Sequence, residues 1–241
     1  MNDEIAILLA AGVGSRMFPL TRTVPKPLME IQGIPLIETI IKGLEKRQVK
    51  RIYIVTGYLG EQFQYLTKKY SNIEIVENEE YLEKNNISSL HAVGDVLGSA
   101  NSFICETDLY VKDMDIFQRN HDCSCYFGKM VNGYSDDWAF LVEGKRITRI
   151  RKGEKDTYNL AGISYWKKND AKVIRDKIGE AYKTKGHENL FWDEIVDLLL
   201  EDIEVHVCEV SQESIVEVDT VEELRMLEEK LNDNSRRIAN E

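Results

Sequence analysis

Several features are scarce in this sequence, and each scarcity excludes a class of protein. No stretch approaches the roughly 20 consecutive apolar residues of a transmembrane helix, and the N-terminal Met1–Glu4 has neither the basic nor the apolar part of a signal peptide. We therefore expect a cytoplasmic protein with no membrane partner. Basic residues are also in deficit, because the 241 residues carry a net charge of −11. This charge argues against nucleic acid as a partner and suits a small cationic substrate.

Cysteine and histidine are equally sparse, with four of each. The cysteines lie at apolar, strand-like positions and form no Cys-x-x-Cys pair, a pattern that favours buried reduced thiols over disulfides or zinc ligands. The histidines likewise show no spacing typical of a metal site. These residues are Cys105, Cys123, Cys125 and Cys208, and His91, His121, His187 and His206.

Proline is the third scarce residue, and all four prolines fall within the first 35 residues. Pro25 and Pro27 flank Lys26, and a proline restricts its own backbone as well as that of the residue before it. We therefore expect a stiff loop that holds the Lys26 side chain in one place.

The residues ahead of this lysine have the character of a phosphate-binding loop. The apolar run Ile5–Leu9 predicts a short buried strand, and Gly12 and Gly14 after it let the backbone turn closely around a bulky group. Main-chain N–H groups there can approach phosphate oxygens, while Arg16 and Lys26 add two cations. The segment lacks both the dinucleotide-binding glycine spacing and the Gly-Lys-Ser/Thr ending of a P-loop, so a tight turn without a ligand is the alternative. We predict a nucleoside triphosphate site lined by Leu9, Ala10, Ala11, Gly12 and Gly14.

Strand-like and helix-like segments alternate along the first half of the chain. Apolar runs predict strands, and apolar residues at helical spacing predict helices between them. The predicted strands are 5–9, 51–57, 73–78 and 102–108, and the predicted helices are 37–44, 63–70 and 90–97. This alternation favours an α/β fold with a mostly parallel sheet and helices on both faces, in which ligands bind at the carboxyl ends of the strands.

After about residue 121 the pattern changes to short strands with turn signals at Asn132-Gly133 and Glu143-Gly144. The predicted strands are 123–130, 138–144, 145–151, 159–166, 204–210 and 214–219, and the predicted helices are 174–181, 190–199 and 221–231. No linker or repeat separates the two halves. We therefore treat 1–241 as a single domain, with a frayed polar tail at 233–241.

The order of residues in Leu9–Leu28 carries a resemblance. This segment resembles the pattern of the nucleotidyltransferase superfamily. The shared pattern is small-Ala-Gly-x-Gly-x-Arg-hydrophobic, followed by Pro, Thr and Pro-Lys-Pro-hydrophobic. Its members join a nucleoside monophosphate to a phosphorylated sugar or alcohol. The resemblance implies a Rossmann-like nucleotidyltransferase fold with a mixed, mostly parallel central sheet, a nucleotide-binding half at 1–120 and an acceptor-binding half at 121–232. It also implies Mg²⁺ as the cofactor.

Two pairs of carboxylates lie at the ends of predicted strands and are candidates for the metal site. They are Glu106 with Asp108, and Glu217 with Asp219. Glu106 and Asp108 alternate along one strand end, so their side chains share a face. The superfamily commonly has Asp-x-Asp there, which implies metal binding by Asp108 and makes Glu106 a departure. Asp219 with Glu222 also fits a helix N-cap with a capping box, but the resemblance implies a metal-binding Asp there. We expect magnesium on Asp108 and Asp219, and a catalytic group of Arg16, Lys26, Asp108 and Asp219.

Over nearly the whole chain the sequence resembles bacterial CTP:phosphocholine cytidylyltransferases. The matching stretches are VTGYLGEQFQYL (55–66), Asn85-Asn86, Ser89-Leu90, Trp138 with Phe140, GISYW (162–166), LFWDEIV (190–196) and SIVEVDTVEEL (214–224). The resemblance implies CTP as the nucleotide, with Asn86 and Ser88 beside it. It implies a choline pocket on Trp138, Asp193 and Glu217. We add Trp192, because aromatic faces and carboxylates together bind an ammonium group; core packing is the alternative for this side chain.

The chain departs from the phosphocholine pattern around the double asparagine. Where those enzymes place aromatic residues, this sequence has Lys84, Ile87 and Ser88. Phosphoethanolamine, 2-aminoethylphosphonate or another phosphorylated amino alcohol therefore stays open as the acceptor, with phosphocholine ranked first. Two different functions also stay open, a sugar-1-phosphate nucleotidyltransferase and a nucleotide-sensing domain without chemistry. A lysine together with two metal-binding aspartates argues against a sensor, which needs no metal.

Overall fold

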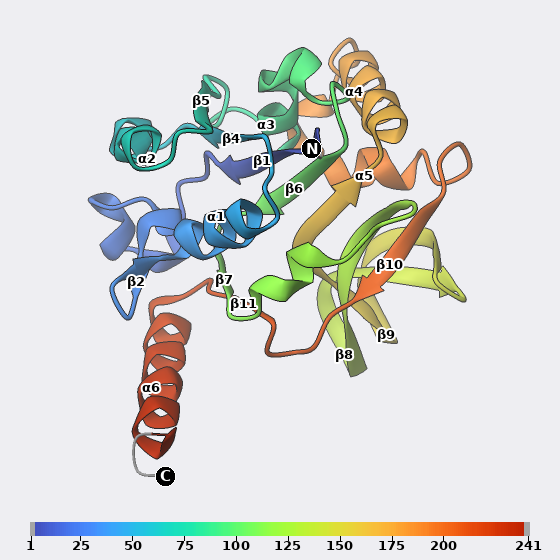
Figure 1. Cartoon of the computed structure of the whole chain (residues 1–241). Coiled ribbons are helices and arrows are strands. Elements are labelled where there is room, and N and C mark those ends of the chain that lie inside the picture. Colours follow the sequence, from blue (N-terminus) through green and yellow to red (C-terminus); the bar gives the residue numbers. More distant parts are fainter. Residues whose placement is uncertain (1–2, 239–241) are drawn as a thin grey trace.

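The computed structural model describes residues 3–238, and a seven-stranded sheet forms its centre (Figure 1). The strand order is β10-β8-β9-β6-β1-β4-β5. Strands β6, β1, β4 and β5 are parallel, β9 is antiparallel to both β6 and β8, and β10 is parallel to β8. The expected α/β fold with a mixed, mostly parallel sheet is confirmed. The strands are β1 (Ile5–Ala10), β4 (Arg51–Thr56), β5 (Ile73–Glu77), β6 (Ser102–Glu106), β8 (Ser124–Glu143), β9 (Arg146–Trp166) and β10 (Val205–Glu209).

Helices cover both faces of this sheet. Side chains of a strand alternate between its two faces, and β1 follows this rule: Leu8 packs in one hydrophobic cluster and Ile7 in the other. Helices α1 and α2 contribute to the first cluster, and α3, α4 and α5 to the second. The helices are α1 (Leu36–Lys46), α2 (Gln64–Lys69), α3 (Ile87–Ala92), α4 (Lys168–Ala181), α5 (Trp192–Asp197) and α6 (Val221–Ile238).

Short elements complete the fold. Two small antiparallel sheets pair β7 (Leu109–Val111) with β11 (Ile215–Glu217) and β2 (Glu30–Ile31) with β3 (Ile34–Pro35). The 3₁₀ turns are η1 (Ser15–Met17), η2 (Leu20–Arg22), η3 (Lys26–Leu28), η4 (Gly60–Phe63), η5 (Gly94–Val96), η6 (Met114–Gln118) and η7 (His187–Asn189). Within residues 3–238, no helix combines the length and the apolar character that a bilayer crossing requires.

The second half differs from its prediction. Instead of four short strands between 123 and 166, the chain forms two long, bent strands, β8 and β9, joined by a turn at Gly144-Lys145. The Asn132-Gly133 signal does not end a strand. Gly133 has a φ of 86° inside β8, and the β8–β9 register shifts between Val131 and Tyr134. Gly133 thus provides a bulge, because its φ is positive, and this bulge bends the paired strands β8 and β9, which we call the β8–β9 arm.

Helix α6 also runs further than predicted. It extends away from the rest of the molecule (Figure 1) and continues to Ile238, whereas the sequence suggested an end at Leu231 and a frayed tail from Asp233. Residues 239–241 of that tail lie outside the described residues.

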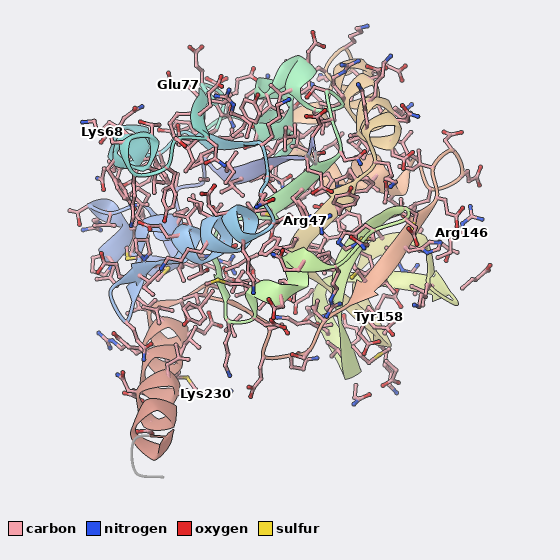
Figure 2. The ribbon with its side chains drawn as sticks, in the orientation of Figure 1. Arg47, Lys68, Glu77, Arg146, Tyr158 and Lys230 are labelled. Carbon is pink, nitrogen blue, oxygen red and sulfur yellow. The ribbon has the colours of Figure 1, made fainter. Side chains whose placement is uncertain are left out.

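A buried ion pair links the two halves of the sheet. Arg47 lies just beyond the end of α1 (Figure 2), and its Nε and Nη2 atoms each lie 2.8 Å from a carboxylate oxygen of Glu4, at the start of β1. Tyr165 of β9 donates its hydroxyl hydrogen to the same carboxylate at 2.9 Å. Burial alone would raise the pKa of Glu4, but the hydrogen bonds from Arg47 and Tyr165 outweigh it and lower that pKa.

Candidate active site

A cavity of about 630 Å³ opens at the carboxyl ends of the parallel strands. Loops after β1, β5 and β6 contribute to it, as expected for a ligand site in such a sheet. All of the predicted site residues except Trp192 and Asp193 line this cavity. They are Leu9, Ala10, Ala11, Gly12, Gly14, Arg16, Lys26, Asn86, Ser88, Asp108, Trp138, Glu217 and Asp219.

Gly14 is required for the position of Lys26. Its φ is 65°, and a Cβ atom at this position would lie 3.0 Å from Cβ of Lys26. Thr21 donates a hydrogen bond to the Gly14 carbonyl at 2.9 Å, which holds the turn against the lysine. Gly12 has a different role, since an added Cβ would meet no atom within 4 Å and would extend into open space at the cavity wall. The first glycine therefore leaves room for a ligand and the second leaves room for the lysine.

Lys26 lies at the centre of the polar side chains. Its Nζ atom is 2.9 Å from Oδ2 of Asp108 and 2.6 Å from Oδ1 of Asp219. Burial on its own would lower the pKa of Lys26, but the charges of the two carboxylates outweigh it and raise that pKa. Arg16 reaches the other oxygen of Asp219 at 2.6 Å. Burial would raise the pKa of Asp219, but the hydrogen bonds and charges of Lys26 and Arg16 lower it. The Lys26 ammonium and the Asp219 carboxylate are therefore both charged at neutral pH.

Backbone pairing brings the two aspartates together from distant parts of the chain. In the β7–β11 sheet Glu217 lies opposite Leu109, and the Val218 N–H donates to the Asp108 carbonyl at 2.9 Å. The capping box considered for Asp219 forms one residue later. Thr220 accepts a hydrogen bond from the Glu223 N–H, and the Glu223 carboxylate accepts from the Thr220 N–H. The Asp219 side chain is therefore left to bind Lys26 and Arg16.

Three carboxylates in this cluster have the chemistry of a magnesium site. Oxygen atoms of Asp108, Glu217 and Asp219 lie within 4.8 Å of one another, and carboxylate oxygens are the ligands that Mg²⁺ prefers. Asp108 Oδ1 is buried and has no hydrogen-bond partner among the described residues, so it can accept a cation. Glu217 is exposed to solvent as a whole residue, but desolvation of its carboxylate inside the cavity, followed by the charges of Asp108 and Asp219, raises its pKa to about 7. The residues present therefore fit a divalent ion.

Glu106 has a different environment from the carboxylate group. Burial, followed by the charge of Asp108, raises the pKa of Glu106 well above its ordinary value. Glu106 is not one of the three carboxylates, Asp108, Glu217 and Asp219, whose oxygen atoms lie close enough together to hold a metal ion. Its carboxylate lies near Gly162, where an added Cβ would come within 3.2 Å of Oε2. The departure from Asp-x-Asp thus places a carboxyl group with a raised pKa at the cavity wall.

The far wall of the cavity carries aromatic rings and a lysine. The rings of Trp138 and Phe191 meet edge to face with centroids 5.5 Å apart. The Nζ atom of Lys152 lies 5.2 Å from the centroid of each ring, a cation–π arrangement. This wall therefore already holds one ammonium group, which belongs to the protein.

Trp192 and Asp193 lie behind the cavity rather than in its wall. They line a separate cavity of about 10 Å³, room for about one water molecule. Trp192 is 3% exposed and stacks on Tyr126, so the core-packing alternative describes its position. Asp193 accepts a hydrogen bond from the Tyr126 hydroxyl at 2.8 Å, and burial raises its pKa to about 7. Glu106 and Leu160 border both cavities and separate Asp193 from the larger one.

Several cavity residues were not selected from the sequence. Asn78 directly follows β5, so the rule for strand ends would have found it. Phe191 directly precedes Trp192, and it is Phe191 that lines the cavity. Asp136, Asp137 and Lys152 lie on the bent pair of strands β8 and β9, and the Asn132-Gly133 signal in the sequence does not distinguish a bend within a strand from a hairpin turn.

The fold and the charged cluster define a class of enzyme that transfers nucleotidyl groups, and comparison with known proteins agrees. The chain belongs to the nucleotidyl transferase family, which matches residues 5–142. It is 48% identical over 220 residues to a 2-aminoethylphosphonate cytidylyltransferase of Lancefieldella rimae, covering 91% of this chain and 89% of the relative.

Two further similarities concern choline-phosphate cytidylyltransferases. The enzyme of Streptococcus pneumoniae is 37% identical over 229 residues, which cover 94% of this chain and 97% of the relative. The solved structure of a CTP:phosphocholine cytidylyltransferase from the same species superposes with a TM-score of 0.87 at 34% identity, over 95% of this chain and 99% of the other. The prediction of a nucleotidyltransferase with cytidylyltransferase relatives is confirmed.

Proposed function

We propose that this protein is a magnesium-dependent cytidylyltransferase that joins CTP to a small zwitterion with a primary ammonium group, with 2-aminoethylphosphonate as the first candidate. The observation that carries the transfer chemistry is the bridge from Lys26 to Asp108 and Asp219 inside the cavity. It places a fixed positive charge beside carboxylates that can bind a divalent ion, which is what a triphosphate substrate needs. Because CTP is a cytoplasmic metabolite, we also place the reaction in the cytoplasm.

The reaction needs no nucleophile from the protein. A phosphonate oxygen of the acceptor attacks the α-phosphorus of CTP, a P–O bond forms there, and the bond to the bridging oxygen of the β-phosphate breaks. Pyrophosphate leaves with the bonding electron pair. Lys26 and Arg16 stabilise negative charge on the phosphates, and main-chain groups of Leu9–Gly14 position them. Asp108 and Asp219 would hold magnesium, which when bound supplies further charge neutralisation.

The acceptor wall supports a primary rather than a quaternary ammonium. A primary ammonium carries three N–H donors that need acceptors, whereas a quaternary ammonium is bound by aromatic faces. Asp136, Asp137 and Glu217 supply carboxylates to the cavity. The two aromatic rings already face the ammonium of Lys152. Similarity to the 2-aminoethylphosphonate enzyme at 48% identity points the same way.

Phosphocholine, ranked first from the sequence, becomes the second candidate. It is favoured by Trp138 and Phe191, whose rings could accept a quaternary ammonium if Lys152 moved aside. Similarity to the S. pneumoniae enzyme over nearly the whole chain also supports it.

Pyrophosphate release with a panel of acceptors tests the proposal. CTP would be supplied with 2-aminoethylphosphonate, phosphoethanolamine, phosphocholine or glucose 1-phosphate, and each kcat/KM compared. The other three nucleoside triphosphates would then be compared with CTP using the best acceptor. We expect the highest kcat/KM with CTP and 2-aminoethylphosphonate. A higher value with phosphocholine would reverse the ranking of acceptors, and turnover with glucose 1-phosphate alone would overturn both candidates.

A further inference from the structure

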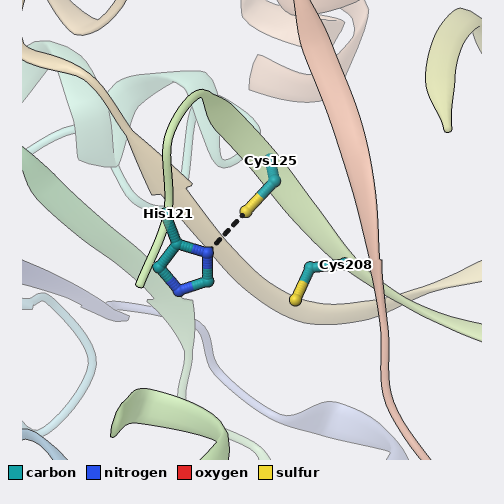
Figure 3. A group of neighbouring side chains, drawn as sticks. All are labelled: His121, Cys125 and Cys208. Carbon is teal, nitrogen blue, oxygen red and sulfur yellow. Dashed lines mark hydrogen bonds between the residues drawn. The ribbon is translucent and has the colours of Figure 1, made fainter. Parts of the chain in front are cut away.

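Three side chains with soft ligand atoms converge away from the active site. Figure 3 shows His121, Cys125 and Cys208 as neighbours, with Sγ of Cys125 directed at a ring nitrogen of His121. One ring nitrogen and the two sulfur atoms lie within 4.8 Å of one another, and Nδ1 of His121 is 3.3 Å from Sγ of Cys125. The cluster was not foreseen from residue spacing, because Cys208 is distant in sequence from the other two.

The fold brings these residues together from three segments. His121 lies in the turn before β8, Cys125 in β8 and Cys208 in the neighbouring strand β10, whose register aligns Cys208 with Phe127. Arg47 fixes the start of the turn by donating to the carbonyls of Phe117 and Arg119. The His121 ring stacks on Tyr165, with centroids 4.6 Å apart. Backbone pairing and ring stacking therefore hold these side chains beside one another.

The cluster lies on the opposite side of β8 from the acceptor wall. Successive side chains of a strand point to opposite faces. Tyr126 points to the face of Trp192 and Asp193, whereas Cys125 belongs to the hydrophobic cluster on the other face. A ligand bound at His121, Cys125 and Cys208 is therefore separated by the sheet from the carboxylates that fit magnesium.

The spacing and the chemical type of these ligand atoms suit a metal ion. Metal–ligand bonds of zinc to sulfur and nitrogen place tetrahedral ligand atoms about 3.6 to 3.8 Å apart, and the observed set lies within about 1 Å of that. Arg119 Nη1 donates a hydrogen bond to Sγ of Cys208 at 3.5 Å.

We propose that His121, Cys125 and Cys208 form a binding site for a thiophilic divalent cation of the zinc class. Two thiolates and a neutral imidazole are soft and borderline ligands, which select zinc over magnesium. Binding releases the thiol protons of Cys125 and Cys208 to solvent, so two thiolate charges neutralise the ion. The three protein ligands found among the described residues leave a fourth tetrahedral position for water. The bound ion joins the turn before β8 to β8 and β10, the base of the arm that carries Trp138.

Cobalt titration of the full, reduced chain tests this site. Co²⁺ replaces zinc in tetrahedral sites, and its thiolate-to-metal absorption appears only if sulfur is bound, so metal held by the active-site carboxylates stays silent. We expect the band to saturate at one Co²⁺ per chain and to disappear on addition of Zn²⁺. Zn²⁺ should also raise the melting temperature of the wild-type protein.

Matched variants distinguish this site from the other thiols. Cys208→Ser is the main variant because Cys208 is only half-buried, and it should abolish the cobalt–thiolate band and the zinc-dependent stabilisation. Cys123→Ser, which removes a half-buried thiol outside the cluster, should preserve both. His121→Ala should weaken cobalt binding at least about tenfold. Melting of the metal-free variants checks that each folds.

Two results would overturn the proposal. One is the absence of a cobalt–thiolate band in folded, reduced wild-type protein. That absence would overturn the proposal even if mild oxidation of a separate sample joined Cys125 to Cys208 in a disulfide. The other is a band of full intensity in the folded Cys208→Ser variant.

Discussion

The two walls of the active site are built in different ways. The nucleotide wall consists of a short continuous segment, Leu9–Lys26, and of loops at the carboxyl ends of parallel strands. The acceptor wall takes Trp138 and Lys152 from the bent β8–β9 arm, Phe191 from the residue before α5, and Glu217 from β11. The first wall presents mainly backbone and small residues, and the second presents side chains from distant segments.

This difference indicates how such an enzyme can keep its nucleotide and change its acceptor. In the proposed reaction, phosphate recognition would depend on backbone geometry, which tolerates few substitutions because Gly14 packs against Lys26. Acceptor recognition would depend on a few side chains that other residues could replace without a change in the backbone. Changes on the nucleotide wall should therefore remove catalysis, whereas changes on the acceptor wall should redirect it.

The largest effect is expected on the nucleotide wall from Lys26→Met. The variant removes the charge that bridges Asp108 and Asp219, so kcat should fall by about 10³-fold. Lys50→Met is the matched control, because Lys50 forms an exposed pair with Asp3 and should not affect turnover. Steady-state kinetics with saturating CTP provides the measurement. An unchanged kcat with only a raised KM for CTP would show that Lys26 binds substrate without stabilising the transition state.

Asp219→Asn should lower kcat by about 10²-fold and raise the magnesium concentration needed for half-maximal activity. The amide keeps the shape of the side chain while removing one of the charges proposed to hold the ion. Asp115→Asn serves as the control, since Asp115 forms an exposed pair with Lys46. If the variant unfolded yet retained full turnover per folded molecule, the assignment of Asp219 to the metal would be wrong.

The Glu4–Arg47 ion pair, which links the two halves of the sheet, can be removed by a substitution at Glu4 that changes no residue of either cavity wall. Glu4→Gln should lower the free energy of unfolding by about 3 kcal/mol at neutral pH, because it leaves the buried Arg47 without its charged partner. The control Glu74→Gln removes a carboxylate from the exposed pair with Arg51 and should cost less than about 1 kcal/mol. Urea denaturation measures both values.

The same ion pair predicts a pH dependence. The pKa of Glu4 is lower in the folded protein than its ordinary value, so its stabilising contribution is complete above the ordinary glutamate pKa. The contribution is lost as the pH falls through the lowered value. The stability difference between wild type and Glu4→Gln should therefore shrink in acid. A difference that stayed constant down to acidic pH would mean that the charge of Glu4 is not what stabilises the pair.

The smallest effect is expected on the acceptor wall from Lys152→Ala. Removing this ammonium frees the faces of Trp138 and Phe191, so the ratio of kcat/KM for phosphocholine to that for 2-aminoethylphosphonate should rise about fivefold. Lys155→Ala, an exposed change on the same strand, is the control and should leave the ratio unchanged. A fall in activity with both acceptors alike would instead assign Lys152 to general binding of the anionic group.

The sequence predicted the residues of the nucleotide wall better than those of the acceptor wall. Residues from Leu9 to Lys26 are close in sequence, so their composition directly describes the cavity wall that they form. The four parallel strands were also predicted, because buried strands are continuous apolar runs. The β8–β9 arm was divided into too many strands, because a glycine bulge and a hairpin turn use similar residues. The position of Trp192 in the core rather than the cavity depends on helix orientation, which its neighbours in sequence do not reveal.

By itself, the sequence determined the alternating α/β order, the glycine-rich loop and the stiffened lysine, since each depends on local backbone preferences and apolar periodicity. Only the tertiary structure decided which charges meet. The β7–β11 pairing brings Asp219 beside Asp108 and Lys26, and the β8–β10 pairing brings Cys208 beside Cys125. The physical reason is that electrostatic and metal-ligand interactions act across a few ångströms of space, whatever the separation of the residues along the chain.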